Sequence, residues 1–574
     1  MRSSLALLTL APLFVSAPLP GAEKSDALPT TVSYYEHIRP VFQAKCQGCH
    51  QPSKAKSDYI MTEVTALIKG GEDGPAIVPG KPDQSHLLEL VVAAPGEESP
   101  EMPPKDEPLT GYELSLVRKW VEQGAKDDTP ANARQRYTMA NPPRYAVPPV
   151  VISLDYSPDG SLLAIAGFHE VLLHKADGSG LVKRLVGLSE RIQSVRFSPD
   201  GKKLAVAGGL PGRMGEIQVW NLEKTELSLS KIVGFDTAYG ANWSPDGKLI
   251  SFGLPDNTVR AIQASDGKQV LFMGSHNDWV LDTDWSVKGD YLFSVGRDMT
   301  AKLTETATER FIDNLTSITP GALNGGLTTI ERHPKFDHIL VGGSDGVPQI
   351  YRSKRETARK IGDNANLIRK YPAMKGRIWD AAFAPDGKTF VAVSSLDGTG
   401  QVHLFQSEYD ATITPELKTL FETVRRAPDG VDKEDPALEE FFTRGAVKLK
   451  GIDTAAAMFS VAFSPDGGTI AASGADGLIH LLDAKTLANK KSFSPIAIDA
   501  TLPVAKPDPA LTDRKKAKHH ETKGALPDGR TVTAISLSPT TLAFDSASRY
   551  AQVLAGLEIA IDEQDLARAI GVDH

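Results

Sequence analysis

A short segment recurs seven times along the 574-residue chain. The copies begin at Leu154, Val195, Ala241, Thr283, Ile330, Ala381 and Val461. Each copy has two short runs of alternating apolar residues, and in five copies the runs are separated by Pro-Asp-Gly. Alternation with a period of two is typical of half-buried strands, and Pro-Asp-Gly is typical of a tight turn. Each copy therefore predicts two antiparallel strands joined by a turn.

The spacing of the copies predicts the architecture. Their third residues are Tyr156, Phe197, Trp243, Trp285, Arg332, Phe383 and Phe463. Most of the intervals between them are close to the roughly 40–45 residues of a β-propeller blade, which is a four-stranded sheet, and the last interval is much longer. We predict an all-β seven-bladed propeller over residues 150–498. The long last interval predicts an insertion over 406–453, between blades 6 and 7, with two short amphipathic helices that either pack on the propeller or form a surface for a partner.

An aspartate recurs after five of the copies, at nearly the same offset each time: Asp256, Asp298, Asp345, Asp397 and Asp476. This offset falls at the turn between the second and third strands, where a carboxylate can accept hydrogen bonds from turn amides. In these features the segment resembles WD-repeat propellers, in which such an aspartate is structural. The repeats are degenerate, since only Trp220-Asn221 approaches the Trp-Asp ending. We interpret His276, Asp298 and Trp285 as a buried structural network rather than a catalytic site.

The two cysteines of the chain lie in the run Cys46-Gln47-Gly48-Cys49-His50. C-x-x-C-H is the attachment pattern of haem c, in which two thioether bonds hold the haem and the histidine binds its iron. A thioredoxin-like dithiol would need a βαβ context, and a zinc site would need a fourth ligand that no further cysteine supplies. We therefore predict one covalent haem c held by Cys46 and Cys49, with His50 as the proximal iron ligand.

Three residues are candidates for the distal iron ligand. Met102 lies far beyond His50 in the sequence, in a Met-Pro-Pro run that predicts an extended loop. His86 is the alternative, and an open site is also compatible with the sequence. Met61 follows His50 closely, which leaves little chain to reach the other haem face. We predict Met102, because a loop of that length can wrap the haem edge and present the thioether to the iron. A Met/His pair raises the reduction potential, which suits electron transfer.

Short helices are predicted around this motif. Thr110 and Glu113 form a capping box, and apolar residues follow at helical spacing up to Val121. Residues 31 to about 128 resemble the planctomycete-type cytochrome c domain. The matching residues are Ile38-Arg39-Pro40, the C-x-x-C-H run, Val78-Pro79-Gly80-Lys81-Pro82 with Ser85, Met102-Pro103-Pro104, and Leu109-Thr110 with Trp120 and Gly124-Ala125. The resemblance implies a small all-α haem domain over 31–130, with His50 and Met102 as axial ligands.

The start of the chain predicts export. Met1-Arg2, an apolar run over 5–15 and small residues before Ala17 or Ala22 are typical of a cleaved signal peptide over 1–22. The alternative is a buried N-terminal strand. The run is too short to span a bilayer, and no later run approaches that length. We expect a periplasmic or cell-surface protein whose mature chain has no membrane span.

The charge distribution bears on partners. The formal net charge of −9 disfavours nucleic-acid binding, which needs clustered positive charge. Residues 31–130 hold 10 Lys and Arg against 16 Asp and Glu, so most of the excess lies there. Acidic residues surround Met102, at Glu97, Glu98, Glu101, Asp106 and Glu107. They favour a basic redox partner, unless they only keep the domain soluble.

The end of the chain is less regular. Residues 499–530 predict a linker, in which His519-His520 is interpreted as solvated rather than metal-binding. Residues 531–574 predict a short β-rich segment. Val532 to Pro539 resembles the opening strand of a bacterial Ig-like domain, but the segment is under half of the roughly 100 residues that such a sandwich needs. An extra edge strand, a truncated domain and an eighth blade remain open.

Together these features predict an exported haem c electron-transfer protein whose propeller binds a protein partner. On this interpretation the chain is a carrier rather than an enzyme, and no catalytic residue is assigned. One alternative is an oxidoreductase whose propeller holds a second cofactor, although no histidine or acidic cluster is assignable to one. The other is a binding scaffold with a structural or sensory haem.

Overall fold

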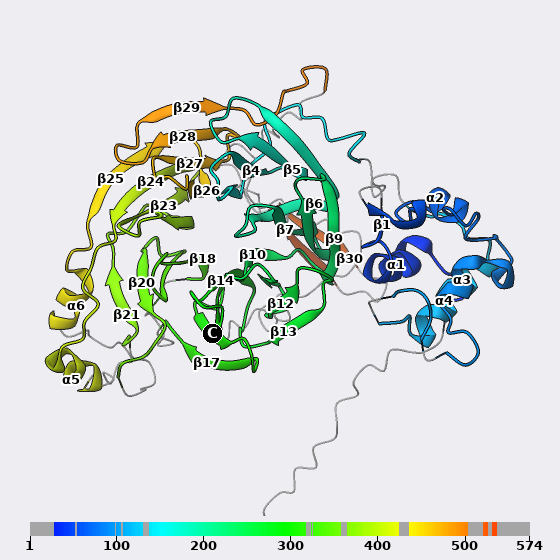
Figure 1. Cartoon of the computed structure of the whole chain (residues 1–574), viewed down its shortest axis with the longest axis horizontal. Coiled ribbons are helices and arrows are strands. Elements are labelled where there is room, and N and C mark those ends of the chain that lie inside the picture. Colours follow the sequence, from blue (N-terminus) through cyan, green and yellow to red (C-terminus); the bar gives the residue numbers. More distant parts are fainter. Residues whose placement is uncertain are drawn as a thin grey trace, which may run out of the picture.

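The computed structural model describes residues 28–51, 54–97, 99–104, 107–129, 137–316, 323, 325–357, 364–423, 436–502, 520–525 and 531–536. The predicted signal peptide, Glu98, Asp106, His519 and residues 537–574 lie outside these ranges. Within them, a unit of short helices precedes a ring of antiparallel sheets (Figure 1). Among the described residues, no helix has the length and hydrophobicity that a membrane span requires.

Short helices build the N-terminal unit. They are a π-helical turn η1 (Tyr34–Ile38), α1 (Arg39–Lys45), the 3₁₀ turns η2 (Lys56–Asp58) and η3 (Pro82–Gln84), α2 (Val64–Lys69), α3 (His86–Leu90) and α4 (Gly111–Glu122). A short hairpin, β1 (His50–Gln51) with β2 (Lys54–Ala55), interrupts them. The unit is therefore mainly helical, and its small hairpin starts at the histidine of the C-x-x-C-H run.

Helix α4 forms where the sequence predicts it. The Thr110 hydroxyl accepts the Glu113 N–H at 3.2 Å, and the Glu113 carboxylate accepts the Thr110 N–H at 2.7 Å. This reciprocal cap satisfies two backbone donors that a helix start leaves free. The helix then buries Val117 and Trp120 in the core of the unit.

Residues 154–493 form six antiparallel sheets. The first has seven strands: β3 (Leu154–Tyr156), β4 (Leu162–Ala166), β5 (Phe168–Lys175), β6 (Leu181–Phe197), β7 (Lys203–Leu210), β8 (Met214–Asn221) and β9 (Glu226–Gly234). The second and third are β10 (Tyr239–Trp243), β11 (Leu249–Gly253), β12 (Val259–Gln263) and β13 (Gln269–Met273), then β14 (Val280–Trp285), β15 (Tyr291–Gly296), β16 (Ala301–Glu305) and β17 (Arg310–Asn314).

The remaining sheets have four strands each. They are β18 (Leu327–Arg332), β19 (His338–Gly343), β20 (Gln349–Arg352) and β21 (Leu367–Lys370); β22 (Arg377–Phe383), β23 (Thr389–Leu396), β24 (Thr399–Gln406) and β25 (Lys448–Thr454); and β26 (Met458–Phe463), β27 (Thr469–Gly474), β28 (Ile479–Asp483) and β29 (Asn489–Phe493). In every sheet, strands adjacent in sequence are hydrogen-bonded neighbours. All seven predicted strand pairs are present.

The first sheet contains two of the predicted repeats because strand β6 is not interrupted between them. The first part of β6 pairs with β5, with Val186 opposite Glu170, and its last part pairs with β7, with Phe197 opposite Leu204. The sheets follow one another around a central axis in chain order (Figure 1). This arrangement is consistent with a β-propeller.

The first and last sheets share a core. Apolar residues of β3 to β5 pack with Ala462, Ala471 and Ile479 of the last sheet. The Leu154 N–H donates to the Ser460 hydroxyl at 3.0 Å, and the Val151 N–H donates to the Gly474 carbonyl at 3.2 Å. The two ends of the ring are thus packed and hydrogen-bonded together.

The turn of the repeat is held by its own side chains. Ser157 donates to Asp159 at 2.5 Å and accepts the Leu162 N–H at 2.9 Å, and Gly160 has a φ of 70°. The same serine–aspartate pair recurs at Ser198, Ser244 and Ser464. Glycine tolerates this left-handed conformation without steric cost, so the Pro-Asp-Gly run specifies the turn locally.

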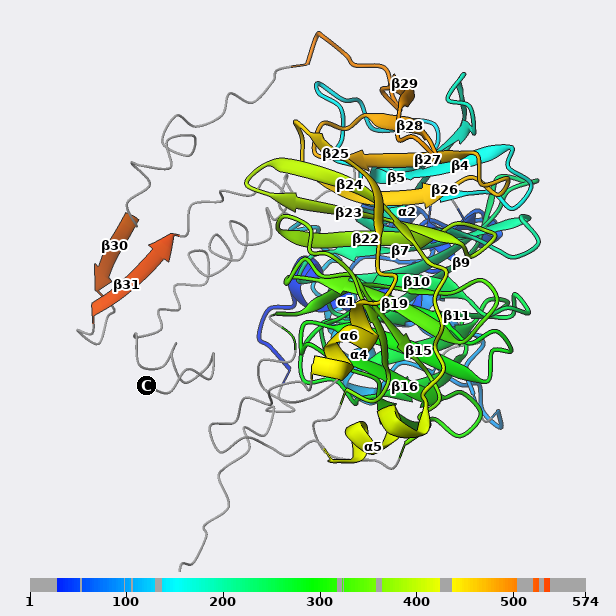
Figure 2. The same ribbon diagram turned by 90° about the vertical axis from the view of Figure 1, so that its left-hand side faces the viewer.

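The helical insertion lies elsewhere than predicted. Helices α5 (Pro415–Thr423) and α6 (Pro436–Thr443) lie between β24 and β25, which are adjacent strands of one sheet, and not between two sheets. Residues 448–453, which the sequence analysis assigns to the insertion, belong to β25. Phe421 and Phe442 are buried against apolar residues of the preceding sheets. Both helices lie at the outer edge of the ring in Figure 1, on the side that faces the viewer in Figure 2. The expectation that these helices pack on the sheets is therefore met by their described residues.

Two further strands follow the ring. β30 (His520–Ala525) and β31 (Thr531–Ser536) pair with each other in a two-stranded antiparallel sheet. Part of the predicted linker is therefore strand. Of the predicted C-terminal β segment, the structure describes only β31.

Candidate haem site

The C-x-x-C-H run forms a tight turn at the end of α1. The N–H groups of Cys46 and Gln47 donate to the Phe42 carbonyl at 2.9 and 2.8 Å and close the helix. The N–H groups of Cys49 and His50 both donate to the Cys46 carbonyl at 3.1 Å. Both cysteines are half-buried and not joined in a disulfide. One turn thus holds two thiols and an imidazole.

The orientation of His50 is set by a backbone group. Its Nδ1 lies 3.3 Å from the carbonyl oxygen of Tyr59, and the two rings lie 5.3 Å apart. With Nδ1 donating to this carbonyl, Nε2 keeps its lone pair for a metal ion. This is the tautomer that an iron ligand needs.

Two buried glutamines brace the turn. Gln47 is 3% exposed and donates to the Met61 carbonyl at 2.8 Å, and Gln51 donates to the Gln47 carbonyl at 3.0 Å. The Met61 N–H in turn donates to the His50 carbonyl at 2.8 Å. The C-x-x-C-H turn and the segment around Met61 are therefore joined by a network of hydrogen bonds.

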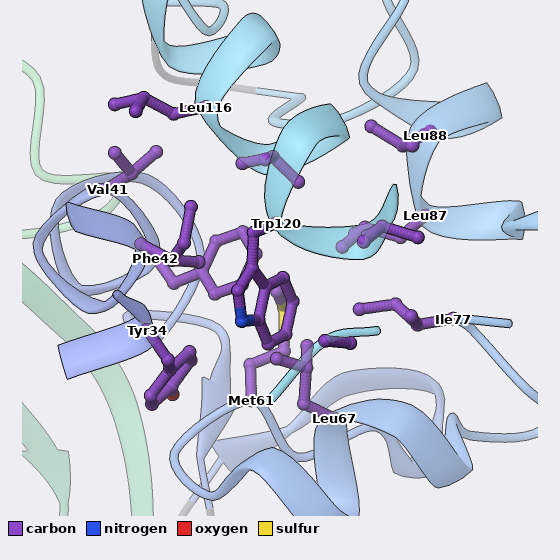
Figure 3. Packing of buried hydrophobic residues seen from close by; sticks show 14 of the residues in the cluster. Tyr34, Val41, Phe42, Met61, Leu67, Ile77, Leu87, Leu88, Leu116 and Trp120 are labelled. Carbon is purple, nitrogen blue, oxygen red and sulfur yellow. The ribbon is translucent and has the colours of Figure 1, made fainter. Parts of the chain in front are cut away.

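An apolar cluster, which we call the haem-domain core, lies beside this network (Figure 3). Trp120 is at its centre, with ring centroids 5.5 Å from Tyr34 and 6.4 Å from Phe42. The Trp120 indole donates to the Lys126 carbonyl at 3.0 Å. Cys46 packs against the same cluster. An apolar surface next to the Cys46 thiol suits the hydrophobic macrocycle of a haem.

The three candidates for the distal ligand differ in burial and in their neighbours. Met61 is 1% exposed inside the haem-domain core, and Met102 is half-buried against it. The Met102 N–H donates to the Leu90 carbonyl at 2.9 Å, which ties its loop to the end of α3. The His86 imidazole lies 3.1 Å from the Glu89 carboxylate, and its side chain is 40% exposed. The two thioethers, and not His86, therefore share a cluster with Cys46.

Tyr34 is a buried donor without a partner. Its side chain is 2% exposed, and its hydroxyl has no hydrogen bond within the part of the chain that the structure describes. Burial raises the pKa of Tyr34 to about 12, although Arg39 opposes the rise. An unsatisfied buried hydroxyl is costly, and a polar group of a bound cofactor would satisfy it. The thiols, the oriented imidazole, the apolar lining and this hydroxyl together fit a covalent haem.

The predicted network of His276 and Asp298 forms on the ring, but its third member is Ser294 and not Trp285. His276 Nδ1 lies 3.1 Å from the Asp298 carboxylate, and its Nε2 lies 2.8 Å from the Ser294 hydroxyl. The Trp285 indole instead donates to the Asn242 carbonyl at 3.3 Å, so it is not part of the network. Burial opposes ionisation of Asp298, but hydrogen bonds, above all from His276, outweigh it and lower the pKa to about 2. The group is buried and satisfied, as a structural network should be.

A second set of charged residues is not predicted from the sequence. It lies on the innermost strands of the ring and consists of Asp155, Arg196, Asp282, Asp284, Glu331 and Asp380. Some of its carboxylates join neighbouring sheets: Asp282 accepts the Ile330 N–H at 3.0 Å, and Asp380 accepts the Val461 N–H at 2.9 Å. The sequence does carry a signal for this set. In five of the seven copies the second residue is polar or charged, although it lies within the alternating apolar pattern of a strand.

Known protein families match both the helical part of the chain and the ring of sheets. Residues 46–106 match the family described as Planctomycete cytochrome C, and residues 267–304, 365–403 and 448–483 match the WD domain, G-beta repeat. Among curated proteins, the chain is 23% identical to the Periodic tryptophan protein 2 homolog of Caenorhabditis elegans over 369 residues, 64% of this chain and 33% of that protein. It is 26% identical to Eukaryotic translation initiation factor 3 subunit I of Drosophila pseudoobscura pseudoobscura over 173 residues, 29% of this chain and 51% of that protein.

The chain thus spans between a third and about half of the length of these curated relatives. The cytochrome family matches the C-x-x-C-H segment, and the WD family matches separate segments on the ring. The chain combines a cytochrome c segment of the planctomycete type with WD repeats.

Proposed function

We propose that this chain is an exported haem c electron-transfer protein whose ring of sheets binds a protein partner. The observation that carries the proposal is the turn of Cys46, Cys49 and His50, with the His50 ring oriented by the Tyr59 carbonyl so that Nε2 faces away from that bond. The family match over residues 46–106 supports haem as the group that this turn holds. A single C-x-x-C-H run, which uses both cysteines of the chain, supports one haem.

The residues have separate roles in this proposal. Cys46 and Cys49 anchor the haem, His50 is its proximal ligand, and Met102 is its distal ligand, with Met61 and His86 as the alternatives. A bound haem supplies a one-electron couple at its iron. Tyr59 holds the imidazole orientation, and the haem-domain core excludes water from the site. A thioether paired with a histidine raises the reduction potential, so the site suits transfer rather than oxygen chemistry.

We further propose that the ring is a closed seven-bladed propeller. Seven strand pairs follow the seven sequence copies, and β6 contributes to two blades. The core and the hydrogen bonds shared by β3 and the last sheet support closure. A closed ring of loops on a rigid scaffold suits binding of a partner, which the proposal assigns to it.

The test compares the wild type with the Cys46→Ala, Cys49→Ala double variant, both expressed with an exported haem-maturation system. The wild type should retain haem through denaturing electrophoresis and exchange one electron with a small redox protein, and the double variant should do neither. A matched control is Thr65→Ala, at an exposed position of α2, which keeps both cysteines and His50. A wild type without covalent haem would overturn the proposal.

A further inference from the structure

The haem-attachment turn rests directly on the ring of sheets. A Cβ added to Gly48 would lie 2.3 Å from the carbonyl oxygen of Ser230 in β9. Both α1 and β2, which flank the turn, also contact β9, and Figure 1 shows the helical unit beside that strand. Because the near atom belongs to the backbone, a side chain at position 48 could not be accommodated without moving one of the two domains.

The strand that receives Gly48 is itself firmly held. Ser230 is 5% exposed, and its hydroxyl donates to the buried carboxylate of Glu216. Glu216 also accepts hydrogen bonds from Ser189 at 2.6 Å and from Gln218 at 2.9 Å. Although β9 is the last strand of its sheet, these hydrogen bonds anchor it to the strands behind it.

A second contact lies nearby, on the turn between β7 and β8. The guanidinium of Arg213 lies 4.9 Å from the centre of the Tyr35 ring, and the guanidinium of Arg39 lies 5.3 Å from the same ring. Two cations from two domains therefore share one aromatic ring at the junction. This arrangement places positive charge from the ring of sheets at the start of the haem-binding helix.

We infer that β9 and Arg213 belong to the environment of the haem and raise its reduction potential. The inference rests on the proposed function, because it needs a haem on Cys46 and Cys49. Gly48 is the residue next to Cys49, and consecutive Cα atoms lie about 3.8 Å apart. Cys49, which would hold one edge of the haem, therefore follows directly after the residue that β9 covers.

The direction of the effect follows from charge. Oxidised haem iron carries one more positive charge than reduced iron. Covering one side of the site with protein removes water that would stabilise this charge, and the guanidinium groups of Arg39 and Arg213 add positive charge at the junction of the two domains, which repels it. Both effects disfavour the oxidised form, so separating the domains or removing Arg213 lowers the potential. The ring of sheets therefore sets part of the reduction potential of the haem domain, which does not act as an independent electron carrier.

Two pairs of variants test this inference on the full-length, haem-loaded protein. Gly48→Ala is compared with Gly111→Ala, where a Cβ meets no atom within 4 Å. Arg213→Ala is compared with Arg297→Ala, which removes a cation–π contact of the same 4.9 Å length, with Trp279, within the ring. The readouts are the reduction potential and the hydrogen exchange of peptides covering residues 39–51 and 226–234.

Gly48→Ala and Arg213→Ala should each lower the potential and speed exchange in both peptides, while the two controls leave both unchanged. Arg213→Ala keeps the test decisive even where Gly48→Ala impairs folding, because it leaves the haem domain's own sequence intact. A potential equal to that of the wild type in Arg213→Ala, with covalent haem present, would overturn the inference and leave the proposed function standing. Absence of covalent haem from the wild type would instead overturn the proposed function.

Discussion

At the scale of single residues, the site consists of groups that the sequence reveals and groups that it hides. Cys46, Cys49 and His50 are predicted from spacing alone, because thioether attachment demands a fixed short motif. The Tyr59 carbonyl that orients His50 is not, since every residue has such an oxygen and only the fold selects one. Met61 is disfavoured by its short reach, yet it is among the most buried residues of the haem-domain core.

Met102 and Met61 can be separated by paired substitutions. Met102→Ala should abolish the weak charge-transfer band of thioether-ligated ferric haem and lower the potential, because the soft ligand is lost. Met61→Ala should keep the band but destabilise the domain by about 2–5 kcal/mol, the usual cost of deleting a buried methionine side chain. Absorption spectra and denaturant unfolding measure both effects. The reverse pattern would make Met61 the ligand.

Tyr34 should make the helical domain sensitive to alkaline pH. Its pKa is about 12 in the folded chain against an ordinary value of 10, chiefly through burial. A group whose pKa rises on folding contributes full stability below its unfolded pKa, and loses it as pH rises from 10 towards 12. Between pH 9 and 11 the wild type should lose about 1.4 kcal/mol more than Tyr34→Phe, measured as the free energy of unfolding. An equal loss in both proteins would show that the phenol is not buried.

At the scale of elements, prediction succeeded where a pattern of side chains encodes the structure. Alternation, with a Pro-Asp-Gly turn in five of the copies, locates the inner strand pair of every repeat, because those strands are buried on one or both faces. The outer strands carry no such pattern: β25 is exposed along most of its length, and so is β29. The length of an interval cannot tell whether extra residues precede or follow an outer strand. For that reason the sequence does not place the insertion before β25, where the structure has it.

The charged cluster on the inner strands predicts an unusual pH dependence of the ring. Burial raises the pKa of Asp282 to about 7, against the opposing effect of Arg196, and raises that of Asp155 to about 6. Stability from a carboxyl with a raised pKa is complete below its ordinary value near 4 and is lost as pH rises through 7. The ring should therefore be more stable at pH 5 than at pH 8, and Asp282→Asn should reduce that difference. Thermal unfolding at the two pH values measures it, and an unchanged difference would contradict the assignment.

At the scale of the whole molecule, the two domains differ in charge and are in direct contact. Glu97, Glu101 and Glu107 are exposed around the Met102 loop, and none of them forms a side-chain ion pair within the described part of the chain. The contact between Gly48 and β9 covers the attachment turn. Sequence analysis predicts both domains, but it could not predict their contact, because a glycine and a backbone carbonyl carry no complementary pattern.

The acidic loop predicts how partners approach. Negative charge steers a positive surface towards the haem domain, and this attraction weakens when the Debye length falls to about 10 Å near 0.1 M salt. The rate of electron transfer to a basic small cytochrome should therefore fall as salt rises, and the rate to an acidic one should not. Neutralising Glu97, Glu101 and Glu107 to glutamine should remove the difference. Equal rates at all salt concentrations would leave these carboxylates without a role in docking.

On the proposed function, this chain is exported and carries one covalent haem. The most direct measurement is the intact mass of the denatured protein, purified after expression with exported haem maturation. The account predicts a chain that begins directly after Ala17 or Ala22, with the mass of one haem added. A chain that still begins at Met1 and carries no haem would contradict it.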